Sequence, residues 1–186
     1  TCYLTHATPA AFYAHSKRRY DNDTIAVQLI NSGIDVAFGS GDKIFTNRKD
    51  GRNLLEEATA AGYNVAHNID DLKECHDGNH ILVYPTGSNH MPAWDERGDY
   101  LPRATAKALE ILSNNSRKGF FAMIEGSLID YGGHGNSAKI TYDETRDFDQ
   151  AVGVAMDFAD QHPGTLVIIL ADHETGGLSI VSNNED

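Results

Sequence analysis

The feature that most constrains this fold is an uninterrupted apolar run that ends in polar side chains. Residues 165–177 read TLVIILADHETGG, so the aliphatic residues from Leu166 to Leu170 lead almost directly to Asp172 and His173. A run this short, apolar and β-branched is typical of a strand buried on both faces, as in a parallel sheet covered by helices. Such folds place their functional side chains at the carboxyl ends of the strands. We therefore expect Asp172 and His173 to lie at a functional edge of a sheet.

Strand-like and helical patterns alternate along the rest of the chain. The strand patterns cover residues 34–40, 63–68, 80–84, 119–126 and 165–173. The helical patterns cover residues 24–33, 51–62, 69–75, 102–113 and 143–161. Asp23 is the expected N-cap of the first of these helices, and the last helix is expected to bury Phe148, Val152, Ala155 and Phe158. Strands separated by helices predict an α/β three-layer sandwich, with a mostly parallel central sheet and helices on both faces.

The composition favours one domain and excludes two classes of partner. A chain of 186 residues with 40% hydrophobic residues suits a single α/β domain over residues 1–186. Fifteen basic residues against 27 acidic ones leave a formal net charge of -12, which argues against binding to nucleic acid. No apolar stretch approaches the roughly 20 residues of a membrane span. We expect neither a nucleic-acid partner nor a membrane span.

Two segments have no regular pattern of their own. Residues 86–100, TGSNHMPAWDERGDY, show neither a helical nor a strand period, so we expect a surface loop insertion of a length that usually has a function. Cys2 and Cys75 lie far apart and form no metal-binding spacing. They either pair or stay free.

A second predicted strand also ends in a residue that can bind a metal. Phe120 to Ile124 lead into Glu125, and right-handed parallel connections bring that strand end to the same edge as Asp172 and His173. The two predicted strands therefore direct carboxylate and imidazole groups into one crevice.

The sequence between these two strands supplies another acid and another imidazole. Asp130 and His134 are four residues apart in EGSLIDYGGHGN. Gly132 and Gly133 disfavour a regular helix, so we expect a glycine-bent loop that brings Asp130 and His134 to one cation. Carboxylate oxygen with imidazole nitrogen is a donor set that suits Zn²⁺ and needs no thiolate.

Each of these groups also has an ordinary structural explanation. Asp172 with His173 could be a capping or hydrogen-bonding pair, the spacing of Asp130 and His134 occurs by chance, and Glu125 could cap the next helix. Groups at two strand ends and in the segment between them are much harder to explain in this way. Together they favour a site for several metal ions.

The amino-terminal region adds a hydroxyl and a basic cluster. Thr8 is expected as a helix N-cap with Pro9 at the first helical position, although the same hydroxyl could bind a hard cation. Arg19 is expected about three helical turns further on, beside Lys17 and Arg18. This cluster is either a phosphate clamp or a solvated helix end.

Four blocks of this sequence resemble the alkaline phosphatase family. They are HATPAAFYAHSKRR, HMPAWDERG, GFFAMIEGSLIDYGGHGN and LADHETGGLSI, in the order in which the family has them. The likeness spans nearly all 186 residues. It implies a partial alkaline phosphatase-like α/β fold and a phosphoric monoester hydrolase that uses two Zn²⁺ and one Mg²⁺.

The resemblance also implies a role for each matched residue. The metal ligands are Thr8 and Glu125 for magnesium, Asp130 and His134 for one zinc, and Asp172 and His173 for the other. Arg19 resembles the arginine that grips two phosphate oxygens. His6 matches a variable position beside the magnesium site, and Tyr131 matches a variable position near the phosphate. Both are expected to tune metal preference and turnover.

The resemblance further implies that the sequence is an internal segment of a larger enzyme. Family members attack phosphorus with a serine in a block resembling DSA, and this chain contains no such block. We expect the segment itself to be inactive and the intact protein to be a periplasmic or extracellular homodimer. The alternatives are a phosphodiesterase, sulfatase or phosphomutase of the same superfamily, and a non-catalytic metal-binding module.

Overall fold

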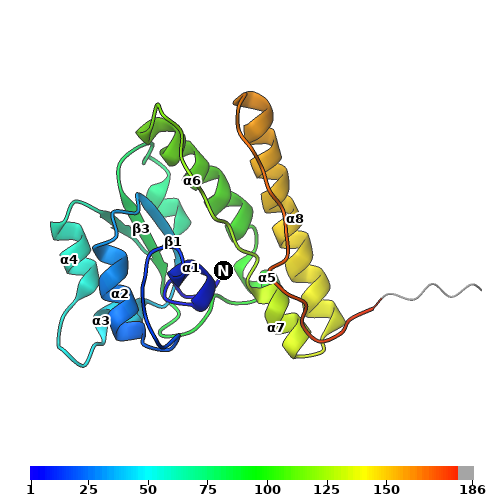
Figure 1. Cartoon of the computed structure of the whole chain (residues 1–186), viewed down its shortest axis with the longest axis horizontal. Helices are drawn as coiled ribbons and strands as arrows, with labels where there is room; N and C mark the ends of the chain where they lie inside the picture. Colours follow the sequence, from blue (N-terminus) through cyan, green and yellow to red (C-terminus); the bar gives the residue numbers. More distant parts are fainter. Residues whose placement is uncertain (180–186) are drawn as a thin grey trace, which may run out of the picture.

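The computed structural model describes residues 1–179 and builds them around a small parallel sheet (Figure 1). The elements, in chain order, are α1 Ala7–Ala10, α2 Asn22–Ile30, β1 Val36–Ser40, α3 Asp42–Thr46, α4 Leu54–Ala60, β2 Asn64–Ala66, the 3₁₀ helix η1 Ile69–Leu72, β3 His80–Tyr84, α5 Trp94–Arg97, α6 Tyr100–Asn115, α7 Leu128–His134 and α8 Ala138–Gln161. Their alternation confirms the predicted α/β class.

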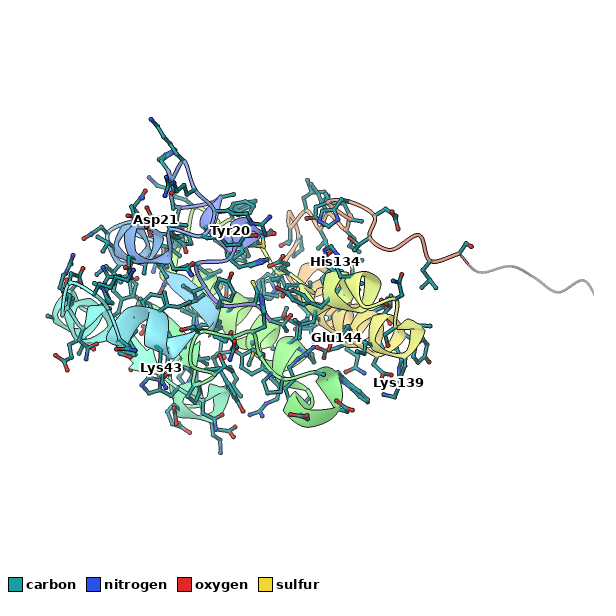
Figure 2. All side chains as sticks on the ribbon, turned by 90° about the horizontal axis from the view of Figure 1, so that it is seen from below. Tyr20, Asp21, Lys43, His134, Lys139 and Glu144 are labelled. Atoms are coloured by element: carbon teal, nitrogen blue, oxygen red, sulfur yellow. The ribbon has the colours of Figure 1, made fainter. Side chains whose placement is uncertain are left out.

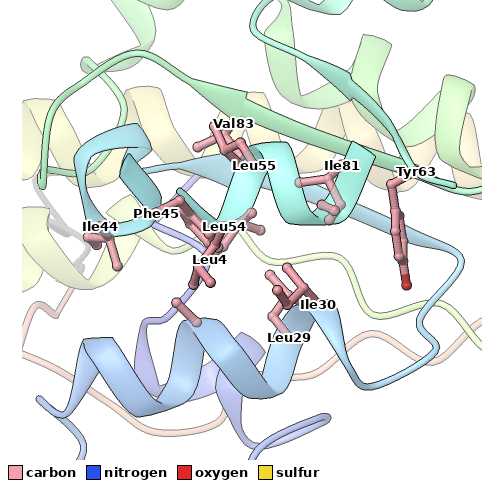
Figure 3. Close-up of a cluster of buried hydrophobic side chains, with 12 residues drawn as sticks. Leu4, Leu29, Ile30, Ile44, Phe45, Leu54, Leu55, Tyr63, Ile81 and Val83 are labelled. Atoms are coloured by element: carbon pink, nitrogen blue, oxygen red, sulfur yellow. The ribbon is translucent and has the colours of Figure 1, made fainter. Parts of the chain in front are cut away.

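The sheet has the strand order β1-β3-β2, and both pairings are parallel. Because successive strand residues point to opposite faces, β3 supplies two cores. Ile81 and Val83 join the cluster under α2, α3 and α4 (Figure 3), while Leu82 joins a cluster formed with η1 and α6. Helices therefore cover both faces of the sheet, as the sequence predicts.

The predicted positions of α2 and α4 are nearly right, but one cap differs. The side chain of Asp21, not Asp23, accepts a hydrogen bond from the Thr24 amide, so α2 begins two residues before the expected start. Asn53 caps α4 in the same manner. Pattern alone cannot choose between two aspartates that are two residues apart, because either could reach an amide in the first turn.

The strands predicted at residues 119–126 and 165–173 are wrong for this structure. Both segments lie outside the hydrogen-bonded sheet. Leu166 is 80% exposed, and Ile168 and Leu170 are each 70% exposed. The carboxyl end of β1 already has a neighbour, since Tyr3 forms a parallel bridge with Ser40. A strand exists only where a neighbour supplies its hydrogen bonds, and no described segment offers these two stretches a partner.

The expected surface loop at residues 86–100 contains a helical turn and a buried charge. Residues Trp94–Arg97 form α5, and the Arg97 side chain is only 1% exposed because it pairs with Glu144 and Asp147 of α8. Polar composition concealed this burial. An arginine within reach of two carboxylates can be buried because all three charges are compensated.

The long helix α8 is confirmed, but its buried face is not the expected one. α8 packs against α6 and α7 (Figure 1) and buries Glu144, Asp147 and Ala151. The residues expected to be buried are only partly covered; they are Phe148, Val152, Ala155 and Phe158. The predicted strands that would have covered this apolar face are not in the sheet. Within residues 1–179, no helix has the length and apolar character needed to cross a membrane.

Candidate metal and phosphate site

The amino-terminal helix begins earlier than expected and presents His6 at its start. His6, not Thr8, is the N-cap residue of α1, and Thr8 lies inside this one-turn helix. The Thr8 hydroxyl makes no side-chain hydrogen bond within residues 1–179. Pro9 is tolerated because the amides of the first turn have no partner within the helix. Thr8 therefore caps nothing, and its predicted role as a metal ligand stays a prediction.

His6 meets two side chains from other segments. A ring nitrogen of His6, the sulfur of Cys2 and a carboxylate oxygen of Glu125 all lie within 4.8 Å of one another. The Cys2 thiol donates to Glu125 Oε2 over 3.3 Å. In the part of the chain that the structure describes, this is the one set of three Cys, His, Asp or Glu side chains that satisfies this spacing. Sequence analysis placed His6 and Glu125 together but missed Cys2.

Burial shapes the protonation of this cluster. It lowers the pKa of His6, an effect that the nearby Glu125 carboxylate opposes, so the imidazole favours its neutral, ligand-competent form. Burial also raises the pKa of the Cys2 thiol to about 12. In addition, the buried Nδ1 of His6 has no hydrogen-bond partner among the described residues.

A second imidazole, which sequence analysis did not single out, lies beside His6. The ring centroids of His6 and His90 are 5.1 Å apart, and those of His90 and Tyr131 are 4.4 Å apart. The Tyr131 hydroxyl hydrogen-bonds His90 Nε2. Burial lowers the pKa of His90 to about 4, so His90 is neutral at physiological pH. Its sequence signals were its place in a long segment without regular pattern and at the start of the family block HMPAWDERG.

Asp130 and His134 lie on a helix, so the predicted glycine-bent loop is wrong. Both belong to α7 and are one turn apart, with His134 Nε2 3.5 Å from Asp130 Oδ2. The two glycines of α7 serve close packing. A Cβ on Gly132 would lie 2.6 Å from the Thr141 amide nitrogen, and one on Gly133 would lie 2.5 Å from the Thr175 carbonyl oxygen. The need for close approach outweighs the helix penalty of about 1 kcal/mol for glycine.

Asp172 and His173 lie on an exposed segment that turns back onto α7. His173 Nε2 is 3.4 Å from Asp172 Oδ2. The Thr175 hydroxyl donates to Asp130 Oδ1 over 2.6 Å and lies 3.0 Å from His173 Nδ1. Thr175, which sequence analysis missed, therefore joins the two predicted zinc pairs. Figure 2 shows His134 on α7 beside this returning segment.

Arg19 lies on an exposed loop and not on the expected helix. α1 ends at Ala10, and the Arg19 guanidinium stacks over the Tyr20 ring at 5.2 Å from its centroid. Figure 2 shows Tyr20 on the same loop. The Arg19 charge still reaches the cluster, since it acts on the pKa values of His6 and Tyr131. A basic side chain that is exposed yet close to the site can bind an anion there.

The residues present fit divalent cations. Carboxylate and imidazole donors occur in two adjacent pairs, Asp130 with His134 and Asp172 with His173. The buried Nδ1 of His6 has no hydrogen-bond partner among the described residues, so it is available to a cation or a water molecule. The described geometry does not bring either pair into a full ligand set, so the metal assignments stay predictions.

Comparison with known proteins gives one consistent result. The family model described as alkaline phosphatase matches residues 1–185. The chain is 38% identical to alkaline phosphatase 4 of Bacillus subtilis over 192 residues, which cover 100% of this chain and 41% of that protein. It is 30% identical to the alkaline phosphatase of Escherichia coli, with 93% of this chain and 47% of that protein covered.

Solved structures agree in fold as well as in sequence. The alkaline phosphatase from the Antarctic bacterium TAB5 matches with a TM-score of 0.86 and 38% identity, covering 95% of this chain and 52% of that one. The cold-active enzyme of Shewanella sp. matches with a TM-score of 0.88 and 35% identity, covering 99% of this chain and 45% of that one. A mutant of the TAB5 enzyme was solved with Mg bound. The chain thus spans about half the length of the proteins it matches, or less.

Proposed function

Because this chain belongs to the alkaline phosphatase family, we propose that the whole protein hydrolyses phosphate monoesters at a site that holds divalent cations. One observation carries the proposal. Side chains from three distant segments converge in the folded chain: His6, Glu125 with Asp130, and His173. Bringing polar groups from distant parts of a chain into one place costs desolvation free energy. A functional site is a reason for a fold to bear this cost.

The cations are assigned to the residues that can hold them. Asp130 with His134 and Asp172 with His173 would each hold a zinc ion, and Glu125 with Thr8 would hold magnesium. When bound, such ions supply Lewis acidity and neutralise charge that develops on phosphorus oxygens. These two zinc ions and one magnesium ion are our proposal, supported by the donor types and by the Mg reported for the TAB5 mutant.

The protein's own groups orient the substrate and the ligands. Arg19 can donate two parallel hydrogen bonds to phosphate oxygens, because its guanidinium is exposed and reaches the cluster electrostatically. Thr175 fixes the carboxylate of Asp130 and the ring of His173 relative to each other. Tyr131 and His90 form a neutral hydrogen-bonded pair beside His6, which can position a phosphate oxygen or a water molecule.

The 186 residues alone should turn over little or no substrate. They span about 40% of the length of the curated relatives, and they carry no block that resembles the family's serine nucleophile. A serine supplied by another part of the protein would attack phosphorus and expel the alcohol of the ester, and water would then hydrolyse the phosphoserine to inorganic phosphate and free serine.

A direct experiment measures turnover of an aryl phosphate by the whole protein, with Zn²⁺ and Mg²⁺ present. We expect Asp172→Ala with His173→Ala to lower kcat/KM by at least about a hundredfold, since it removes one cation's protein ligands. The matched control changes Asp160 and His162, an exposed acid and imidazole at the far end of α8, to Ala. Equal loss in both variants, or faster turnover of an aryl sulfate or a phosphodiester than of the monoester, would refute the assignment.

We also propose that the whole protein is exported and acts as a homodimer, as the family resemblance implies. Cell fractionation and sedimentation of the whole protein test these two points. Recovery only inside the cytoplasmic membrane, or as a monomer, would contradict them.

A further inference from the structure

We propose that His90 is a positioning residue for the substrate phosphate, because its Nε2–H group donates a hydrogen bond to the Tyr131 hydroxyl oxygen and leaves the Tyr131 hydroxyl proton free to donate to a phosphate oxygen. The inference rests on the proposed function, since it names the two side chains that act together on the phosphate group of the monoester. It also gives a role to His90, for which the family resemblance supplies none.

The backbone on both sides of His90 is held in place. The Asn89 carbonyl oxygen accepts a hydrogen bond from the Ser40 hydroxyl over 2.9 Å. The Met91 amide donates to the Thr1 carbonyl oxygen over 3.2 Å, and Met91 is only 4% exposed. Ser40 is the last residue of β1. These bonds therefore fix His90 at the carboxyl end of that strand.

Three aromatic rings hold the His90 imidazole between them. The centroid of its ring lies 4.7 Å from that of Tyr3, 5.1 Å from that of His6 and 4.4 Å from that of Tyr131. Tyr3 is itself held against β1 by its bridge with Ser40. The two nitrogens of the His90 ring consequently have different surroundings. Nε2 meets the Tyr131 hydroxyl, whereas Nδ1 is buried and has no hydrogen-bond partner among residues 1–179.

These unequal surroundings select the tautomer of His90. Burial lowers the pKa of His90 to about 4, so the ring is neutral and only one of its nitrogens carries a proton. Either tautomer leaves Nδ1 without a partner. Among buried backbone groups, an unpaired acceptor is tolerated more often than an unpaired N–H donor, and the same preference places the His90 proton on Nε2. The Tyr131 oxygen then accepts, and the Tyr131 proton must find another acceptor.

Tyr131 lies where the phosphate is proposed to bind. It follows Asp130 on α7 and is 42% exposed. Burial raises the pKa of Tyr131, the Asp130 carboxylate adds to this increase and the Arg19 guanidinium opposes it. The Tyr131 hydroxyl is therefore within electrostatic reach of the proposed phosphate clamp and of a proposed zinc ligand. A phosphate oxygen is a strong, charged acceptor, and the substrate brings it to this place.

The test is isothermal titration calorimetry of the whole protein, loaded with Zn²⁺ and Mg²⁺, with inorganic phosphate. We expect Tyr131→Phe to raise the dissociation constant by about tenfold or more, the size expected for one hydrogen bond to a charged group. His90→Phe keeps an aromatic ring but removes the N–H donor, and should raise the constant by more than about threefold. His90→Gln keeps an N–H donor near the place of Nε2 and should stay within about twofold of the parent.

A control and a double variant separate positioning from a structural role. His76→Phe is the matched control, because His76 is an exposed imidazole that pairs with Glu110 before the amino end of β3; its dissociation constant should equal that of the parent. If His90 acts only through the Tyr131 hydroxyl, His90→Phe with Tyr131→Phe should bind phosphate as weakly as Tyr131→Phe alone. Effects that multiply in the double variant, or parent-like binding by His90→Phe, would overturn the inference.

A second measurement uses the parent protein and needs no folded His90→Phe variant. Nuclear magnetic resonance of the whole protein with ¹⁵N-labelled histidine shows which ring nitrogen of His90 carries the proton, and His90→Gln identifies the signal by its loss. We expect the Nε2–H form, and the Nδ1–H form would overturn the inference. Turnover of an aryl phosphate is scored separately. Turnover with the Nδ1–H form refutes this inference alone, whereas the Nε2–H form and weakened phosphate binding by Tyr131→Phe, without turnover by the parent, refute the proposed function alone.

Discussion

Replacing Arg97 with methionine should be among the most damaging single changes in this chain. The Arg97 side chain is 1% exposed and lies 2.5 Å from Glu144 Oε2 and 2.6 Å from Asp147 Oδ2. These carboxylates are themselves 2% and 0% exposed. Methionine fills much of the space but leaves two buried negative charges without a partner.

The magnitude follows from the cost of an uncompensated buried charge. Breaking a buried ion pair by removing one partner costs about 3–5 kcal/mol. For a chain of this size, each kcal/mol lowers Tm by about 2–4 °C, so we expect Arg97→Met to lower Tm by about 6–20 °C. Thermal unfolding followed by circular dichroism, at about pH 8, measures this difference.

The effect should depend on pH in a defined direction. Burial raises the pKa of Asp147 even with Arg97 present, and loss of Arg97 removes the positive charge that opposes this increase. At a pH between the carboxyl's pKa in the unfolded chain and its higher pKa in the folded variant, the folded variant binds more protons than the unfolded chain. The stability of the variant therefore increases as the pH falls through this range. The Tm difference from the parent should therefore shrink between about pH 8 and about pH 5.

A charge-free variant serves as the control. Arg97→Met combined with Glu144→Gln and Asp147→Leu removes all three charges, and glutamine keeps an acceptor for the Trp94 amide that now donates to Glu144 Oε1 at 2.9 Å. We expect this variant to recover most of the lost stability, because an apolar replacement of a buried ion network is often neutral. An Arg97→Met variant within about 1 kcal/mol of the parent, or a loss that does not shrink in acid, would refute the reasoning.

Three further predictions test local packing. Gly132→Ala should lower Tm, because overpacking against the Thr141 backbone costs about 1–3 kcal/mol, which exceeds the gain in helix propensity from glycine to alanine. Gly153→Ala has open space around its Cβ and should raise stability by about 1 kcal/mol. Equal shifts in Tm for the two variants would contradict the packing argument. Asp21→Ala should lower the free energy of unfolding, measured by urea denaturation, by about 1 kcal/mol, because α2 loses its N-cap. No change would mean that the Thr24 amide finds another acceptor. Leu166→Thr should change the stability of this chain by less than about 0.5 kcal/mol, since Leu166 is 80% exposed. It should also increase the solubility of the chain. A large loss of stability would show that the segment is buried in solution.

Local patterns in the sequence were enough for the elements whose partners are nearby. The apolar spacing of Leu54, Leu55 and Ala58 predicts α4, and the apolar run of residues 80–84 predicts β3, because the faces they bury follow directly from residue type and period. The resemblance to the alkaline phosphatase family, and not local pattern, placed His6 and Glu125 together. It missed Cys2, since nothing in its local sequence says that residue 2 lies beside residue 125.

What the sequence by itself determined was the α/β class and the positions of most helices, since residue chemistry and period are local properties. The donor residues that it suggests for a metal site stay a prediction. Only the tertiary structure decided which of these segments gain partners. It left residues 119–126 and 165–173 outside the sheet, made α7 a helix despite its glycines, and buried Arg97 against α8. Hydrogen-bond partners, close backbone approach and charge compensation all depend on residues far away in the chain, so no local pattern can encode them.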